Sequence, residues 1–334
     1  MTNPSDSRPV RLQRSELAVP AIRKDFFEKA AQGPADVIFL DLEDAVPPEL
    51  KLEARALAIA GLNEVDWGAK VMAVRVNGLD TPWAVHDIID VVEACPRLDM
   101  ILLPKAASAF DVRFVETILA SIEQDKGRAK RIGIEVLIET AMGVANVEEI
   151  AASSPRLEAM IFGVGDYSIS MGIFDARIGA PSPDYAVLSD ADAAGLRSLH
   201  WNDHWHFAKA RIATACRAWG LRPIDGPYVD IGDPQGYRNT AQRAQALGFE
   251  GKWAIHPSQA PLANEVFTPS TEVVASARKM MDVIADAQAR RIGAVSVDGK
   301  LIDMAMVKLA DRITRRVELI RQRDAIMPQG AGAR

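Results

Sequence analysis

The sequence is poor in cysteine, since Cys95 and Cys216 are the only two among 334 residues. Two thiols cannot build the disulfide framework of a small secreted protein, so we expect a reducing compartment, by default the cytoplasm. No apolar run approaches the roughly 20 residues that a membrane-spanning helix needs. Residues 1–10 are polar and lack the apolar core of a secretory signal. These absences exclude the disulfide-rich secreted and membrane-embedded classes of protein.

Positive charge is not in excess either. The chain carries 39 Lys and Arg against 45 Asp and Glu, a net charge of −6. This mild acidity argues against a nucleic-acid partner, because proteins that neutralise phosphates normally present a basic face. Hydrophobic residues make up 49% and charged residues 25%, as in average soluble domains. We therefore expect a soluble globular protein, and most simply an enzyme.

Short, mostly aliphatic runs bounded by Pro, Gly or charged residues predict buried strands. These runs are residues 15–19, 37–42, 71–76, 100–103, 132–138, 159–162, 221–224 and 252–255. Between them lie segments with helical spacing, such as 49–62, 111–124 and 206–219. Continuously apolar strands suit a parallel sheet that is covered on its outside. Strand–helix alternation repeated about eight times predicts a (β/α)₈ barrel of the α/β class.

Two segments exceed what a minimal barrel needs. Residues 175–203 are long and polar, and such a loop in a compact domain is usually functional or disordered. Beyond the last strand, 270–289 and 303–323 read as helices on either side of a turn at 295–301. We therefore divide the chain into a catalytic barrel, residues 1–268, and a helical extension, residues 269–334. The extension either packs on its own barrel or forms a lid on a neighbouring subunit.

Charged and polar residues follow almost every predicted strand. In a barrel of this type the active groups lie at the carboxyl ends of the strands. Glu139 and Asp166 follow successive strands, and two oxygen ligands with open positions suit Mg²⁺. The alternative is that each acid only caps the following helix. Taken as a pair beside Asp41, Glu43 and Asp44, they favour a metal site. There is no His-x-x-His or Cys-x-x-Cys spacing that would indicate zinc.

Arg75 ends an otherwise apolar strand. Its guanidinium suits a substrate carboxylate or a developing oxyanion, and the alternative is an ion pair with Glu43 or Asp44 that closes the barrel mouth. We favour the substrate role, because an arginine beside a metal suits a small oxo-acid anion. The histidines at 200, 204 and 206 alternate with tryptophans, which favours aromatic packing over a metal site. Neither cysteine has a neighbouring motif for a catalytic thiolate.

Several motifs together resemble a known group of enzymes. DLEDAV (41–46), VRVNGLDT (74–81), Pro104-Lys105 and EVLIETAMGVANVEEIA (135–151) resemble the citrate-lyase β-subunit-like branch of the HpcH/HpaI aldolase superfamily. RPIDGP (222–227), GKWAIHPSQ (251–259) and ANEVFTPS (263–270) narrow the resemblance to malyl-CoA/β-methylmalyl-CoA lyases. The likeness runs from about residue 11 to the helix after residue 303. It implies reversible, Claisen-type cleavage of a short hydroxy-dicarboxylyl-CoA to glyoxylate and acetyl-CoA or propionyl-CoA.

The resemblance also implies roles for single residues. Glu139 and Asp166 would bind Mg²⁺, or Mn²⁺ in its place, and Arg75 would contact the oxo-acid. Asp303, in the lid motif KLID (300–303), would be the acid/base over a neighbouring subunit's site. Asp41, Glu43 and Asp44 would lie behind the direct ligands. The substrate and CoA ester would contact Ala18, Arg23, Lys29, Arg75, Gly165, Asp166, Ile255 and His256. Such enzymes are usually trimers or hexamers.

The chain departs from the family pattern at a few positions. Pro20 is followed by Ala21-Ile22 where the family usually has Gly-Ser, which restricts the backbone or crowds the CoA portion. Ala106-Ala107 replaces the commoner Val-Gly, and the segment 178–181 lacks a second glycine. A lyase with altered acyl-CoA preference is the reading we favour. The alternatives are a malyl-CoA thioesterase, a citramalyl-CoA lyase and a non-catalytic CoA-ester-binding paralogue.

Overall fold

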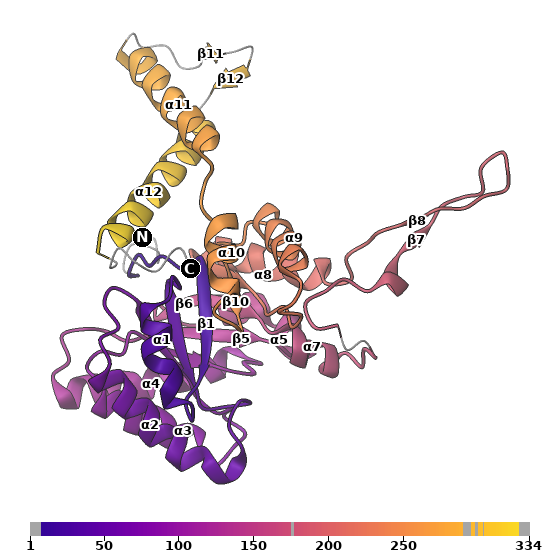
Figure 1. Ribbon diagram of the computed structural model, residues 1–334. Helices are drawn as coiled ribbons and strands as arrows, with labels where there is room; N and C mark the ends of the chain where they lie inside the picture. Colours follow the sequence, from indigo (N-terminus) through magenta and orange to yellow (C-terminus); the bar gives the residue numbers. More distant parts are fainter. Residues whose placement is uncertain (1–7, 175–176, 290–294, 298–299, 303, 327–334) are drawn as a thin grey trace.

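Parallel strands close into a barrel in a computed structural model, which describes residues 8–174, 177–289, 295–297, 300–302 and 304–326 (Figure 1). The strand order is β1-β10-β9-β6-β5-β4-β3-β2. The first and last strands close the barrel, with Ser15 opposite Lys252 and Leu17 opposite Ala254. The predicted (β/α)₈ barrel is confirmed. The barrel strands are β1 (Ser15–Pro20), β2 (Val37–Asp41), β3 (Val71–Arg75), β4 (Met100–Leu103), β5 (Gly133–Ile138), β6 (Leu157–Phe162), β9 (Arg222–Asp225) and β10 (Gly251–Ala254).

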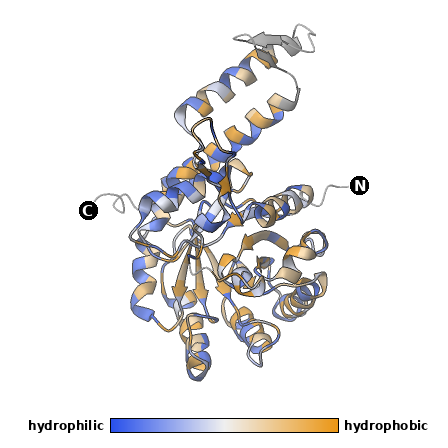
Figure 2. Cartoon of the chain, turned by 90° about the vertical axis from the view of Figure 1, so that its right-hand side faces the viewer, coloured by the Kyte–Doolittle hydropathy of each residue, from blue (hydrophilic) through white to orange (hydrophobic). Residues whose placement is uncertain are grey.

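Helices surround the barrel and present their polar faces outward (Figure 2). No helix within the described ranges combines the length and apolar character needed to cross a bilayer. Short 3₁₀ turns, Lys24–Phe26 and Pro48–Leu50, precede α1 and α2. The helices of the barrel are α1 (Phe27–Gln32), α2 (Lys51–Glu64), α3 (Ala84–Ala94), α4 (Ala109–Lys126), α5 (Ala141–Ala145), α6 (Val147–Ala151), α7 (Val164–Ser170), α8 (His206–Trp219), α9 (Pro234–Ala246) and α10 (Gln259–Val266).

Local sequence explains where the longer helices begin and end. Ser108 and Asp111 form a capping box at the start of α4, and Gly127 ends this helix with a φ of 61°. Asp233 accepts a hydrogen bond from the backbone nitrogen of Gly236 at the start of α9. Gly220 ends α8 in the left-handed region, at a φ of 70°. The helix predicted at 206–219 is therefore observed with the predicted bounds.

The strands pack on two apolar layers, because successive side chains of a strand point to opposite faces. One layer fills the barrel and includes Phe39, Leu102, Ile161 and Trp253, all buried. The other layer lies between the strands and the helices. Both faces of each strand are thus covered, which explains the continuous apolar runs in the sequence.

The long polar segment at 175–203 is partly structured. Val187–Leu188 (β7) pairs antiparallel with Leu199–His200 (β8), and this hairpin projects away from the barrel (Figure 1). A 3₁₀ turn, Pro183–Tyr185, precedes the hairpin. Both side chains of β7 are exposed. The hairpin therefore contributes nothing to the core of its own barrel.

The C-terminal extension consists of two long helices and a small hairpin. α11 (Thr271–Ala289) leads outward and α12 (Met304–Ile326) returns beside it, with β11 (Val295–Val297) and β12 (Lys300–Ile302) at the far end (Figure 1). The returning helix is anchored to the barrel by Arg316, which donates from Nη2 to the carbonyl of Glu250 at 2.6 Å. Arg323 donates from Nη2 to the carbonyl of Ala35 at 2.9 Å. Both anchors lie near the amino ends of the strands.

Candidate active site

Acidic side chains that follow three strands converge at the carboxyl end of the barrel. Asp41 is the last residue of β2 and leads into Glu43 and Asp44, while Glu139 directly follows β5. Asp166 lies in the first turn of α7, just after β6. Arg75, the last residue of β3, and Lys105, after β4, bring positive charge to this group. We call these seven residues the acidic mouth.

Arg75 is held by carboxylates on three sides. Its Nε and Nη2 donate to the two Asp41 oxygens at 2.7 Å each. Its Nη1 lies 3.0 Å from Glu43 Oε2 and 3.4 Å from Asp44 Oδ2. Burial alone would raise the pKa of Asp41, but the Arg75 guanidinium holds that pKa below its usual value. The ion pairs of Arg75 with Glu43 and Asp44, which the sequence offered as the alternative to a substrate role, are therefore present. Asp41 is an additional partner.

Lys105 links two of the acids. Its Nζ lies 2.6 Å from Glu43 Oε1, and its backbone nitrogen donates to Glu139 Oε1 at 2.8 Å. Lys105 has a φ of 53°, and no other non-glycine residue in the described ranges has a positive φ. A side chain in this left-handed conformation costs free energy, so the surrounding contacts must enforce it. In the sequence, Lys105 was noted only as part of the Pro104-Lys105 motif, and its role at the site was missed.

Glu139 and Asp166 are the acids of the mouth that lack an ion-pair partner among the described residues. Burial, together with the charges of Glu43 and Asp166, raises the pKa of Glu139 to about 8. Burial and the charge of Asp44 likewise raise the pKa of Asp166. The charge of Arg75 acts in the opposite direction on both pKa values, and that of Lys105 acts so on Asp166, but these cations do not cancel the upward shifts.

This donor set fits a hard divalent cation. Mg²⁺ is usually held by one or two carboxylates and completes its octahedron with water or substrate oxygens. Glu139 Oε1 accepts a hydrogen bond from the Lys105 backbone, and Oε2 accepts none from the described residues. The described residues contain no group of three or more His, Cys, Asp and Glu that would form an all-protein metal cage. An open site with two carboxylates therefore suits Mg²⁺.

Gly163 makes room for Glu139. This glycine ends the turn between β6 and α7, and a Cβ built on it would overlap the Cβ and Oε2 of Glu139. Gly165, two residues later, is less constrained, because its Cβ would meet Ile178 at an ordinary 3.7 Å. The glycine at 163 is thus required by the position of the carboxylate.

The residues expected to contact the CoA ester lie around two neighbouring strands. Ala18 lies in β1, which pairs with β10. Arg23 and Lys29 are exposed after β1, and the Arg23 guanidinium lies 3.8 Å from the centre of the Phe26 ring. Ile255 and His256 directly follow β10 and are also exposed. These five residues therefore lie on one side of the barrel, which is compatible with an extended ligand.

The histidines and cysteines do not form a second site. The ring of His204 packs on Trp205 with centroids 3.7 Å apart, as aromatic packing predicts. His200 lies on the exposed hairpin strand β8. Cys95 and Cys216 are buried in the core, and burial raises the pKa of Cys95 to about 12. The predicted acid/base, Asp303, lies outside the described residues.

Comparison with known proteins identifies a family model and similar lyases. The family model HpcH/HpaI aldolase/citrate lyase matches residues 14–257. The L-malyl-CoA/β-methylmalyl-CoA lyase of Cereibacter sphaeroides is 47% identical over 93% of this chain and 96% of its own length. The malyl-CoA/β-methylmalyl-CoA/citramalyl-CoA lyase of Chloroflexus aurantiacus is 35% identical over 97% of this chain and 90% of its own.

A solved structure adds the ligands of a relative. The protein CitE of Mycobacterium tuberculosis, in complex with magnesium, acetoacetate and coenzyme A, superposes with a TM-score of 0.68. It is 29% identical, and the match covers 92% of this chain and 99% of that one. The resemblance inferred from the motifs is confirmed. This chain belongs to the HpcH/HpaI aldolase/citrate lyase family.

Proposed function

We propose that this protein catalyses the Mg²⁺-dependent, reversible cleavage of malyl-CoA or β-methylmalyl-CoA to glyoxylate and acetyl-CoA or propionyl-CoA. The observation that carries the proposal is the pair of carboxylates, Glu139 and Asp166, which have raised pKa values and form no ion pair with any described residue. The identity of 47% to a lyase with these two substrates supports the choice of substrate.

Glu139 and Asp166 are the residues that would hold Mg²⁺. When bound there, the ion would act as a Lewis acid and as a template for the oxygens of the oxo-acid. Glu139 is kept in place by the Lys105 backbone and by the absence of a side chain at Gly163. Asp41, Glu43 and Asp44 fix Arg75 and Lys105 rather than bind substrate themselves.

Arg75 would bind the oxo-acid carboxylate. Its hydrogen bonds to Asp41 and Asp44 use three of its five N–H groups, and its Nη1 also pairs with Glu43, so one N–H of Nη2 remains for a ligand. The Asp41 carboxylate fixes the plane of the guanidinium in advance, which lowers the cost of orienting it during the reaction. In cleavage, the substrate hydroxyl releases its proton to water and becomes the aldehyde oxygen of glyoxylate, and the proton later gained at the enolate carbon balances this loss. The bond between the two carbons breaks, and its electron pair forms the enolate of the acyl-CoA.

Asp303 would donate a proton to that enolate carbon, and would remove the same proton in the condensation direction. β12, which directly precedes Asp303, lies at the far end of α11 and α12 from its own barrel (Figure 1). Since these helices attach at the amino ends of the strands, their tip points away from their own acidic mouth. This supports a homo-oligomer, a trimer or hexamer, in which residues 269–334 form a lid on a neighbouring subunit.

Product identification tests the proposal. The purified chain is incubated with Mg²⁺ and malyl-CoA, β-methylmalyl-CoA or citramalyl-CoA, and the products are identified by mass spectrometry. From malyl-CoA or β-methylmalyl-CoA we expect glyoxylate and an acyl-CoA, and loss of both products in Glu139→Gln, whereas cleavage of citramalyl-CoA would release pyruvate in place of glyoxylate. Glu53→Gln, an exposed residue on α2, serves as the matched control and should retain activity. Free malate and CoA would instead identify a thioesterase, and tight binding without turnover would identify a non-catalytic paralogue.

A further inference from the structure

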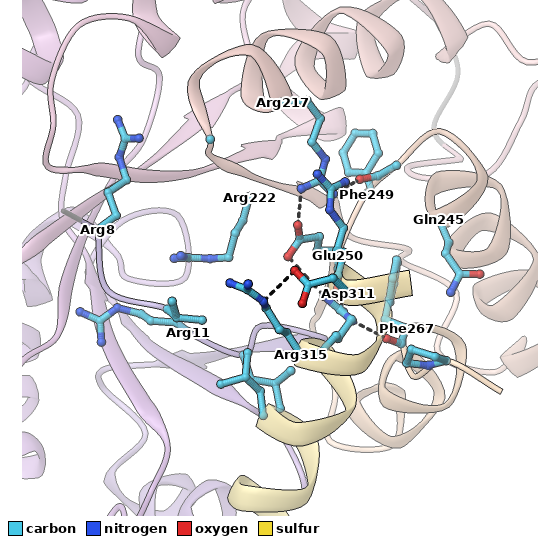
Figure 3. Close-up of a pocket in the computed structure, with 18 of the residues that line it drawn as sticks. Arg8, Arg11, Arg217, Arg222, Gln245, Phe249, Glu250, Phe267, Asp311 and Arg315 are labelled. Atoms are coloured by element: carbon cyan, nitrogen blue, oxygen red, sulfur yellow. Dashed lines mark hydrogen bonds and ion pairs between the residues drawn. The ribbon is translucent and has the colours of Figure 1, made fainter. Parts of the chain in front are cut away.

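A cavity lies at the end of the barrel opposite the acidic mouth. Its volume is about 580 Å³, and its walls come from residues 8–12 before β1, Arg222 at the start of β9, and Glu250 just before β10. α12 covers one side of this cavity (Figure 3). Catalytic groups of such barrels lie at the carboxyl ends of the strands. We call this space the basal cavity, and it is separate from the acidic mouth.

The basal cavity is strongly basic in an acidic protein. Eight arginine and lysine residues line it, against two carboxylates, Glu250 and Asp311, whereas the whole chain has a net charge of −6. Figure 3 shows Arg11 and Arg222 on the strand side of the cavity and Asp311 and Arg315 on the helix α12. Five of these cations pair with carboxylates: Arg11 and Arg222 with Glu158, Arg217 and Arg316 with Glu250, and Arg315 with Asp311. The remaining excess of positive charge concentrates ligands of the opposite sign.

One face of α12 supplies part of this charge. Lys308, Arg312 and Arg316 follow one another at intervals of four residues, so they share a face of the helix, and all three line the cavity. Arg316 is committed to the barrel through the carbonyls of Glu250 and Phe267. Lys308 and Arg312 are exposed and form no ion pair with any residue in the described ranges. Like charges four residues apart on a helix repel one another, so this row of three cations does not stabilise α12 by itself.

Arg8 adds a buried donor on the opposite wall. Its Nη1 donates to the carbonyl of Trp219 at 2.6 Å, but its buried Nε has no hydrogen-bond partner among the described residues. Burial and the nearby charge of Arg222 lower the pKa of Arg8, although Glu158 acts in the opposite direction. An anion in the cavity would offset this repulsion and would leave the existing contacts intact.

The remaining wall is apolar. Leu12, Phe249, Phe267 and Leu319 line the cavity beside the cations. Small-molecule sites commonly have volumes of about 300–1,000 Å³ and combine apolar walls with a few charged groups. The basal cavity therefore suits a ligand that has both a compact multiple charge and an apolar part.

We propose that the basal cavity binds a small molecule with two adjacent phosphate groups and an aromatic or apolar portion, such as a nucleoside diphosphate. Lys308 and Arg312 bind the phosphates, and the apolar wall receives the remainder. Guanidinium groups favour phosphate because they donate two parallel hydrogen bonds to it. This site is independent of the lyase activity proposed above.

Calorimetric titration of the full chain with ADP and with inorganic pyrophosphate, without Mg²⁺, tests this proposal. We expect saturable binding of both probes, weaker for pyrophosphate. Arg312→Ala and Lys308→Ala should each weaken ADP binding by about tenfold or more, whereas Arg312→Lys should retain most of the affinity. Arg321→Ala is the matched control, since Arg321 lies on the same helix but pairs with Glu318 outside the cavity. It should bind ADP as the parent chain does.

Three outcomes would overturn the proposal. They are the absence of saturable ADP binding, an equal loss of affinity in Arg321→Ala, and ADP binding that Arg312→Ala and Lys308→Ala leave unchanged. The last result would place ADP at the CoA-ester side of the acidic mouth instead. Lys308 and Arg312 are exposed, so both variants are expected to fold, and an unchanged thermal midpoint checks this.

Discussion

Glu139 Oε1 accepts a hydrogen bond of 2.8 Å from the backbone nitrogen of Lys105, a residue that follows a neighbouring strand. The strained φ of Lys105 aims that nitrogen at the carboxylate, while the Lys105 side chain reaches Glu43. One residue thus positions two acids by two different groups. Substitution of the Lys105 side chain removes only one of these contacts.

Mg²⁺ binding should depend on pH through Glu139. Its pKa of about 8 means that the metal-free native chain holds a proton there at pH 7, which the metal must displace. The affinity for Mg²⁺ should therefore rise about tenfold per pH unit up to about pH 8 and then level off. Titration calorimetry in buffers of different ionisation enthalpy measures the released proton.

The raised pKa of Glu139 also makes the stability of the metal-free fold depend on pH: Mg²⁺ affinity should rise with pH, whereas stability should fall. The native chain without metal holds more protons than the unfolded chain between about pH 4.5 and pH 8. The contribution of Glu139 to the free energy of unfolding is therefore present at low pH and is lost as the pH rises through this window. For the preceding prediction, an affinity for Mg²⁺ that does not change between pH 6 and pH 8 would contradict the assignment of Glu139 as a metal ligand.

Gly163→Ala should weaken the metal site. The added Cβ overlaps the Glu139 side chain, which must move, and we expect a loss of at least about tenfold in Mg²⁺ affinity. Gly33→Ala is the control, because its Cβ would approach the nearest atom, the carbonyl oxygen of Ala30, at 3.4 Å. Calorimetric titration with Mg²⁺ compares the two variants. Equal affinities would show that Gly163 does not position the carboxylate.

Asp303→Asn should reduce turnover without affecting metal binding. A positioned acid or base contributes about 10²–10⁴-fold to a proton transfer, so kcat should fall within that range. The rate of glyoxylate release from malyl-CoA gives kcat, and Mg²⁺ titration gives the control measurement. Full activity in this variant would remove Asp303 from the proposed proton transfer.

Asp225→Ala should destabilise the fold. Asp225 is buried and lies 2.6 Å from Lys252 Nζ and 2.9 Å from Lys209 Nζ. Its removal would leave two buried ammonium groups unpaired, at a cost of about 3–5 kcal/mol in the free energy of unfolding. Urea denaturation measures this loss. Asp190→Ala, at an exposed position, should change stability by less than about 0.5 kcal/mol.

The barrel could be predicted from the sequence because each strand is a short apolar run between polar segments. β4 has the predicted bounds, and β2 and β3 end one residue earlier than predicted. The hairpin of β7 and β8 could not be predicted, since each strand has two residues and neither carries a periodic pattern. The division at residues 268 and 269 stays a prediction.

The acidic mouth was accessible from the sequence because a parallel barrel brings all strand ends together. The contact of the Lys105 backbone with Glu139 was not, because it depends on a backbone angle that the residue type disfavours. The basal cavity was also missed. Its cations come from segments as distant as residues 8–12, 217–222 and 308–316, and no local pattern joins them.

The pairing of β1 with β10 has a consequence for synthesis of the chain. The first strand meets its second neighbour only when residues 252–254 have been made, so most of the protein must leave the ribosome before the cylinder can seal. Until then, β1 and the newest strand each present an unpaired edge that other chains can join. A product that stops before residue 251 would keep both edges open, and we expect it to aggregate.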